Sequence, residues 1–191
     1  IFFKDHIIFH MICRATRWHA GCEAKDRSEG HSLECFELCW AGIHGAPKNF
    51  YVDGERGMVS DFVKAALRSR GCTVIVRAPE QHARFIERRG AMPRFSLLSG
   101  EQEMIRSSIS VTFPILLAQH ILAGSVMVYC GGCSPYQALY GRQPAMLPDR
   151  QAEGPEQGET VGDYSATARV REIALGAMIQ ATAAARINRT L

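Results

Sequence analysis

The chain has 191 residues, of which 47% are hydrophobic and 21% are charged. This composition supports one globular domain with a buried core and excludes wholesale disorder. The formal net charge of +3 is too small to predict nucleic-acid binding by itself. That prediction must therefore rest on where the charges lie.

The seven cysteines predict reduced thiols in an intracellular protein of the nucleus or cytoplasm. Their number is odd, and a chain of this length needs no disulfides to fold. The opening run IFFKDHIIFH lacks the layout of a signal peptide and begins directly on a strand-like pattern. We therefore expect a fragment whose first strand lies upstream.

An antiparallel hairpin is predicted for residues 6–13 and 16–23, which are rich in strand-forming residues around a short polar break. Asp26 or Ser28 can cap the helix that follows. The predicted apolar face of that helix consists of Leu33, Phe36, Trp40 and Ile43.

A short strand at 49–52 ends at Asp53, and Ser60 can cap a helix that continues to Arg70. The predicted buried face of this helix consists of Phe62, Val63, Ala66 and Leu67. The strand at 72–76 is apolar throughout, which predicts burial on both faces. A further helix is expected to begin near Gln81.

The second half of the chain is predicted to be helical. Residues 107–141 contain no Asp, Glu, Lys or Arg, but polar residues interrupt the stretch and are costly in lipid. We expect a buried helix at 114–127 and no membrane partner. A short helix follows at 134–141, then an acidic linker at 147–163 and an Ala-rich helix at 165–189. The element order predicts an α/β fold with a mixed sheet that lacks its first strand.

Two carboxylates are candidates for a metal site. Asp53 ends a strand, and Glu87 lies on the helix after the next strand, so the two can converge. Paired carboxylates suit Mg²⁺ or Mn²⁺, and two such ions can promote phosphodiester chemistry. Glu55 and Glu80 are alternatives, and solvated surface carboxylates are the simpler interpretation.

Five arginines and two glutamates lie between residues 77 and 94. Arg84 and Arg88 share one helical face, and Arg89 follows them. These side chains could hold DNA phosphates beside the carboxylates, a contact that carries no sequence information. The alternative is a solvated basic face.

A resemblance to a known family joins these features. Residues 47–89 resemble the catalytic core of retroviral and retrotransposon integrases, through Gly45-Ala-Pro47, Asp53, Gln81-His82 and Ile86-Glu87-Arg88-Arg89. The run MICRATRW (11–18) is similar to the hairpin turn before that core. The run SPYQALYGRQP (134–144) is similar to the segment after it in Gypsy-type polyproteins.

The resemblance implies an RNase H-like fold and a triad of two Asp and one Glu, with Asp53 as its second member and Glu87 as its third. It also implies magnesium or manganese, DNA integration by 3′-end processing and strand transfer, and a homo-oligomeric parent enzyme. Residues 1–146 would form the core, 147–163 the linker and 164–191 a C-terminal helix.

Departures from the family pattern leave alternatives open. The first Asp of the triad is expected upstream, because Asp5 runs directly into the next strand with no room for a hairpin. Pro93 is expected to end or bend the Glu87 helix. A catalytically inactive remnant that binds nucleic acid or protein is therefore the second hypothesis, and a generic α/β domain the third. A zinc site from His6, His10, Cys35 and Cys39 is disfavoured, because the two histidines lie too far apart along one strand.

Overall fold

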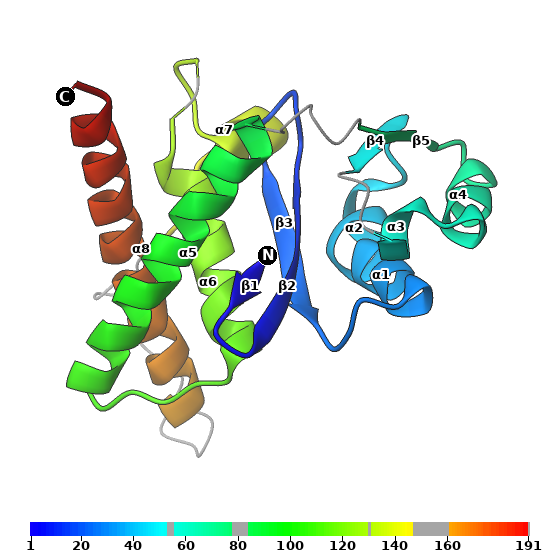
Figure 1. Cartoon of the computed structure of the whole chain (residues 1–191). Coiled ribbons are helices and arrows are strands. Elements are labelled where there is room, and N and C mark those ends of the chain that lie inside the picture. Colours follow the sequence, from blue (N-terminus) through cyan, green and yellow to red (C-terminus); the bar gives the residue numbers. More distant parts are fainter. Residues whose placement is uncertain (53–55, 78–83, 130, 147–160, 191) are drawn as a thin grey trace. The chain divides into compact units, whose positions relative to one another are not determined.

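The computed structural model describes residues 1–52, 56–77, 84–129, 131–146 and 161–190 (Figure 1). The side chains of 56, 84–89, 92, 161–165 and 188–190 lie outside that description. The chain forms two compact units. Unit 1 comprises Ile1–Met11 and Ala20–Arg88, and unit 2 comprises Ile12–His19 and Arg89–Leu191.

Three strands lie in the order β1 (Phe2–Phe3), β2 (His6–Ile12), β3 (His19–Ala24). The predicted hairpin is confirmed as β2 and β3. A short strand precedes β2, since Phe3 pairs antiparallel with His6 across a two-residue turn. Asp5 lies in that turn and not on a strand, as expected. Lys4 makes this turn possible by adopting a φ of 51°, which tight hairpin turns require.

Helix α1 (Glu29–Phe36) begins at the predicted cap, where the Ser28 hydroxyl accepts a hydrogen bond from the backbone N–H of His31. It continues as a π-helical turn at Glu37–Ala41 and then as α2 (Gly42–His44). The predicted apolar face is wrong at its end, because Ile43 is 62% exposed. The wider π turn shifts the phase of the later residues by part of a turn.

Strands β4 (Asn49–Val52) and β5 (Thr73–Val76) pair in parallel, with Val52 opposite Val76. Between them lie α3 (Arg56–Val59) and α4 (Asp61–Arg68), and Ser60 caps α4 as predicted. Two expectations of burial are wrong: Phe62 is 61% exposed, and Val76 is also exposed. The prediction of a single mixed sheet is wrong for the described residues, which form two separate sheets, and in the second of them β5 has only β4 beside it.

Helix α5 (Arg84–Arg106) passes through Pro93, so the expectation that the helix ends early at this proline is wrong. An interior proline removes one helical hydrogen bond and costs about 3 kcal/mol. Pro93 is buried, as are Ser96 and Leu97 one turn later. Burial of this face offsets the local cost.

Unit 2 has a core between α6 (Phe113–Met127) and α8 (Val161–Thr190). Pro114 lies in the first turn of α6 as predicted, and the core consists of Ala123, Val128, Ala174, Leu175 and Met178. The predicted buried helix is confirmed as α6. In the described part of the chain, none of the helices has the length and apolarity needed to cross a bilayer.

The short helix α7 (Pro135–Tyr140) matches its prediction closely. Ser134 and Gln137 form a capping box at its start, and Gly141 ends it with a φ of 70°. The linker predicted at 147–163 lies outside the described residues as far as 160, and α8 begins at Val161. The division into core, linker and helix stays a prediction.

Candidate functional site

The predicted metal site belongs to the carboxyl end of the β4–β5 pair. Asp53 directly follows Val52, the last residue of β4, and ligand sites of parallel sheets gather at this edge. Asp53 lies outside the described residues. Glu87 belongs to the first turn of α5, but its side chain lies outside them too. Their convergence on one cation therefore stays a prediction, as do the alternatives Glu55 and Glu80.

The segment after Asp53 is anchored by a close backbone contact within unit 1. A Cβ on Gly57 of α3 would lie 2.6 Å from the Arg27 carbonyl oxygen and 2.8 Å from the Ser32 hydroxyl oxygen. Only glycine permits this approach. On the other side, the rings of Phe36 and Phe50 pack at 5.3 Å between α1 and β4. Helix α1 thus supports both β4 and α3, the elements that flank Asp53 in the sequence.

Arg77 is the one predicted basic residue next to this edge whose side chain contacts are described. Its backbone N–H donates to the Val52 carbonyl oxygen at 3.0 Å, which extends the β4–β5 ladder. Its guanidinium carbon lies 5.5 Å from the centroid of the Tyr51 ring, within the range of a cation–π contact. The Arg77 guanidinium is therefore held near the carboxyl end of β4, the strand that Asp53 follows in the sequence. The side chains of Arg84, Arg88 and Arg89 lie outside the described part.

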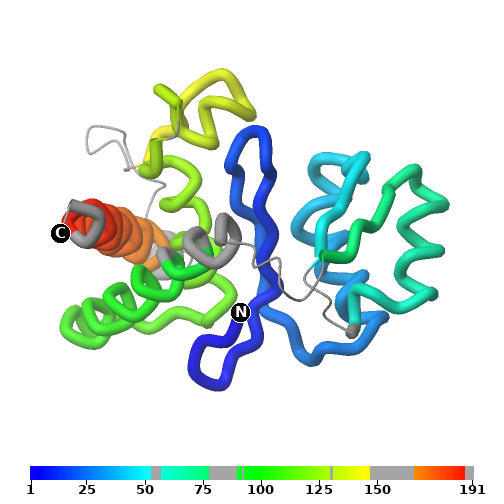
Figure 2. Tube along the Cα trace, turned by 45° about the horizontal axis from the view of Figure 1, so that its top comes forward, coloured from blue at the N-terminus to red at the C-terminus, as the bar shows by residue number. Residues whose placement is uncertain are grey.

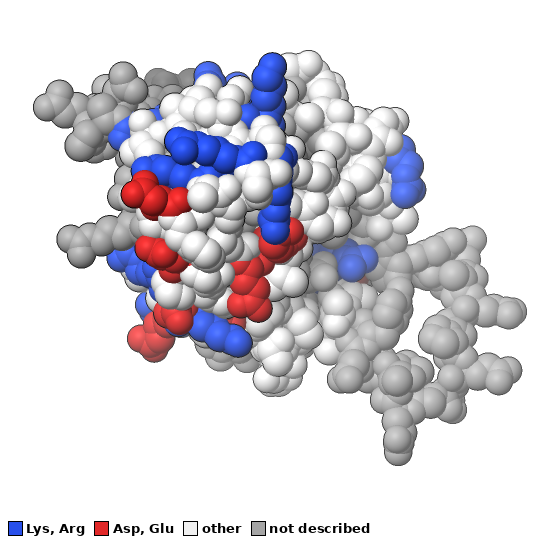
Figure 3. All heavy atoms as spheres, turned by 90° about the vertical axis from the view of Figure 1, so that its right-hand side faces the viewer, with Lys and Arg blue, Asp and Glu red and all other residues white. Residues whose placement is uncertain are grey.

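The charged surface of unit 1 carries both signs. Figure 3 shows Lys and Arg interspersed with Asp and Glu on the face it draws. Lys64 lies 3.8 Å from Asp61, and Arg70 pairs with Glu37. Such pairs at the surface are worth about 0–1 kcal/mol, but they neutralise the cations locally.

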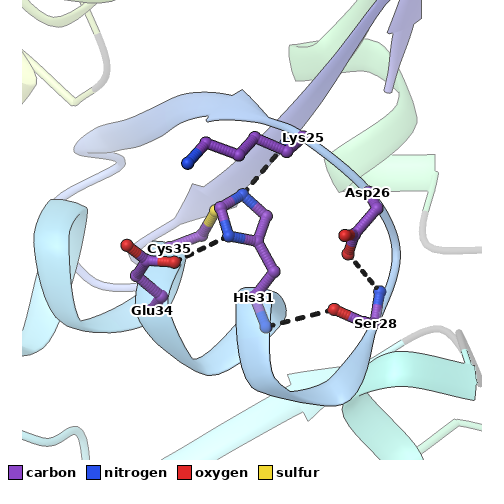
Figure 4. Close-up of polar contacts among 6 residues, drawn as sticks. All are labelled: Lys25, Asp26, Ser28, His31, Glu34 and Cys35. Atoms are coloured by element: carbon purple, nitrogen blue, oxygen red, sulfur yellow. Dashed lines mark hydrogen bonds and ion pairs between the residues drawn. The ribbon is translucent and has the colours of Figure 1, made fainter.

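A second polar cluster surrounds the start of α1 (Figure 4). His31 Nδ1 lies 2.8 Å from Glu34 Oε2, and His31 Nε2 lies 3.6 Å from Cys35 Sγ. This order, thiol to imidazole to carboxylate, is that of an activated cysteine nucleophile. Two facts contradict that role. Cys35 is only 1% exposed, and burial raises the pKa of its thiol to about 12.

The cluster at the start of α1 is therefore structural. His31 Nε2 accepts a hydrogen bond from the Lys25 N–H at 2.9 Å, and Asp26 Oδ1 accepts one from the Ser28 N–H at 2.8 Å. The second bond satisfies the backbone donor of the cap residue, and the first satisfies a donor in the connection before the helix. The imidazole joins the β3–α1 connection to the helix, and it activates nothing.

Thiols also gather beside α1. The Cys39 thiol donates to the Cys35 carbonyl oxygen at 2.8 Å, and a hydrogen bond to Cys39 raises the pKa of the Cys22 thiol. A metal would need thiolates. Among the side chains that the structure describes, no group of three or more His, Cys, Asp or Glu could hold a metal ion. These cysteines are free thiols.

Comparison with known proteins identifies the fold. No family model matches the chain, and no curated protein does either. The HTLV-2 integrase catalytic core domain in complex with magnesium (trimeric form) matches it with a TM-score of 0.54 and 9% identity, over 70% of this chain and 92% of that one. The fold is integrase-like.

A chain of the simian T-cell lymphotropic virus intasome in complex with PP2A regulatory subunit B56 gamma is also similar in structure. Its TM-score is 0.53 at 11% identity, over 81% of this chain and 59% of that one. At 9% and 11% identity, the similarity concerns the backbone arrangement alone. The mixed α/β fold similar to an integrase core is thus confirmed, and the residue roles are not tested.

One group of side chains is not evident from the sequence alone. Its members belong to separate segments: residues 11–18 contain one aromatic residue and two arginines, and residues 134–144 contain two aromatic residues and one arginine. In unit 2 the Trp18 ring lies 5.9 Å from that of Tyr136 and 5.7 Å from that of Tyr140. The shared composition was the available signal, but nothing in the sequence shows that the two segments meet.

Proposed function

We propose that this chain is a fragment of the catalytic core of a retrotransposon integrase of the Gypsy type. The parent enzyme trims a DNA 3′ end and joins it to target DNA. One observation carries the proposal: an integrase-like fold in which Asp53 directly follows β4 and Glu87 lies in the first turn of α5. These are the positions that the family pattern assigns to two of its three acids.

The chemistry follows from those carboxylates. Asp53 and Glu87 would hold Mg²⁺ or Mn²⁺, since oxygen ligands suit these hard ions. The 3′-hydroxyl oxygen attacks a phosphorus atom of the target, and the bond from that phosphorus to its leaving 3′ oxygen breaks. Two metal ions stabilise the attacking and leaving oxygens of such a displacement. Arg84, Arg88 and Arg89 position DNA phosphates, and Arg77 adds a cation at the same strand end.

The remaining acid of the triad is not assigned to a residue of β1, because Phe2 and Phe3 form that strand. Asp5 lies in the turn between β1 and β2. We place the first Asp upstream of Ile1, on an RNase H-like opening strand. Assembly into a homo-oligomer belongs to the same proposal, and the HTLV-2 core is described in a trimeric form.

Strand transfer is the decisive test, measured with Mg²⁺ on a chain extended by its upstream codons. Asp53→Asn and Glu87→Gln should each lower the rate at least about 100-fold, because a metal ion contributes several kcal/mol to such transition states. The matched control is Asp61→Asn, since Asp61 is an exposed carboxylate whose ion pair with Lys64 is long, at 3.8 Å. The control should keep the full rate.

Two results would contradict these roles. Unchanged strand transfer in both Asp53→Asn and Glu87→Gln would remove the proposed mechanism. Loss of activity in Glu80→Gln with full activity in Glu87→Gln would move the third acid to the loop before α5.

A second function is an inactive integrase remnant that serves as a nucleic-acid or protein interaction module. It is compatible with the same integrase-like fold, because a fold does not by itself determine function. Calorimetric titration with Mn²⁺ separates the two candidates. Binding that Asp53→Asn abolishes supports the enzyme, and absence of any heat of binding supports the remnant.

A further inference from the structure

An aromatic surface of unit 2 has no role in the proposed chemistry. Trp18 of the β2–β3 loop and Tyr136 and Tyr140 of α7 form what we name the aromatic wall. Each pair of its rings lies in contact, since the two tyrosine rings are 4.7 Å apart and Trp18 lies within 6 Å of both. Tyr140 is 46% exposed, and Trp18 and Tyr136 are partly exposed. Figures 1 and 2 both show the hairpin tip beside α7.

The aromatic wall is held in place by hydrogen bonds on both sides. The Cys13 N–H donates to the Trp18 carbonyl oxygen at 2.9 Å, which closes the hairpin loop. The His19 N–H donates to the Ser125 hydroxyl at 3.3 Å, which joins the loop to α6. The capping box of Ser134 fixes the start of α7. A surface ordered in advance loses little entropy when a ligand binds.

The charged residues of the two segments that carry the aromatic wall have one sign. Arg14 and Arg17 belong to the hairpin loop, and Arg142 follows Tyr140 by two residues. Arg14 and Arg142 are exposed. The hairpin loop contains no carboxylate, and neither does the sequence between Glu103 and Asp149. Aromatic rings beside arginines, without acids in either segment, suit a polyanion whose units carry flat rings.

We propose that the aromatic wall is a stacking platform for single-stranded nucleic acid, with the arginines contacting its phosphates. This inference rests on the proposed function, in that an integrase must handle a DNA end. Stacking accepts any base, since every base has a π face, so we expect little sequence preference. A paired duplex hides its base faces and should bind more weakly. A proline-rich peptide could use the rings but would gain nothing from the arginines.

The test measures fluorescence anisotropy of labelled dT15 with the full 191-residue chain in EDTA. Tyr140→Ala should weaken binding about tenfold, because removing one aromatic ring costs about 1–3 kcal/mol per stacked base. Tyr140→Phe keeps the ring and should retain the affinity. Phe62→Ala in unit 1 is the matched control, since Phe62 is also an exposed ring, and it should bind like the wild type.

A second readout follows the platform directly. The chain has two tryptophans, so Trp40→Phe leaves Trp18 as the reporter. Its fluorescence should be quenched by dT15 and less by the duplex of the same sequence. Equal dT15 affinity in Tyr140→Ala and wild type overturns the inference, as does binding of a proline-rich peptide without dT15.

The use of EDTA separates this inference from the proposed function. Binding of dT15 through Tyr140 in a protein without strand transfer supports the platform and contradicts the enzyme. Strand transfer that depends on Asp53, with dT15 affinity unaffected by Tyr140→Ala, supports the enzyme and overturns the platform.

Discussion

Two histidines, one in each unit, show how the surroundings of a residue decide its role. His31 in unit 1 has both ring nitrogens in polar contacts, with Glu34 on one side and the Lys25 N–H on the other. His120 in unit 2 is completely buried. Its Nδ1 lies 2.6 Å from the Ser96 hydroxyl oxygen, and its Nε2 has no hydrogen-bond partner among the residues that the structure describes. The first imidazole organises a helix start, and the second fills a contact between α5 and α6.

The difference is energetic. A buried ring with one unbonded nitrogen costs free energy that the packing around it must offset, and burial lowers the pKa of His120 to about 4. The stability of unit 2 therefore depends on His120 being neutral. The contacts of His31, by contrast, are hydrogen bonds at the start of a helix. Three predictions follow from this contrast, in order of decreasing effect.

Acid should destabilise unit 2 through His120. Between its folded pKa of about 4 and the ordinary value of 6.5, the unfolded chain binds a proton that the folded chain excludes. Stability is therefore complete above pH 6.5 and falls as the pH drops toward 4, by about 3 kcal/mol at about 1.4 kcal/mol per pH unit. Urea unfolding at several pH values measures this loss.

The comparison variant for the acid experiment is His120→Gln, which keeps a polar group near Ser96 but cannot titrate. Burial also lowers the pKa of His10 in unit 1 to about 4, so the difference between the two proteins is the quantity of interest. Identical pH dependence in wild type and His120→Gln would contradict the role of His120.

Gly100→Ala should destabilise the same contact by about 2 kcal/mol. The added Cβ would lie 2.4 Å from His120 Nε2, and a completely buried ring bonded to Ser96 has no room to move, so the core is overpacked. Gly176→Ala in α8 is the matched control because its Cβ would meet nothing within 4 Å. The control should unfold at a higher temperature than the wild type, since alanine favours helices. A higher unfolding temperature for both variants would contradict the tight packing of Gly100 against His120.

Ser28→Ala should have the smallest effect, a loss of about 1 kcal/mol, because it removes the hydroxyl that accepts from the His31 N–H at 3.3 Å. Ser69→Ala is the control, since the Ser69 hydroxyl donates to a helix carbonyl at an exposed position and should change stability by less than about 0.5 kcal/mol. Hydrogen exchange should increase in α1 and stay unchanged in α6. Faster exchange in both helices would mean that the hydrogen bonds around His31 stabilise more than the start of α1.

The contrast between local and long-range features also explains which expectations about the site were met. Caps, hairpins and apolar runs involve neighbours in the sequence, so Ser28, Ser60 and the capping box at Ser134 were predictable. The positions of Asp53 and Glu87 relative to strands and helices were predictable for the same reason. Whether their carboxylates meet depends on side-chain placement, which no periodicity encodes.

By itself the sequence determined where most elements begin and what type they are, because propensity, capping and hydrophobic period act over a few residues. Only the tertiary structure decided that α5 continues through Pro93 and that Trp18 meets Tyr140. Each of these outcomes depends on groups brought together from distant parts of the chain. Their packing energies exceed the local preferences, and a sequence pattern records only the local ones.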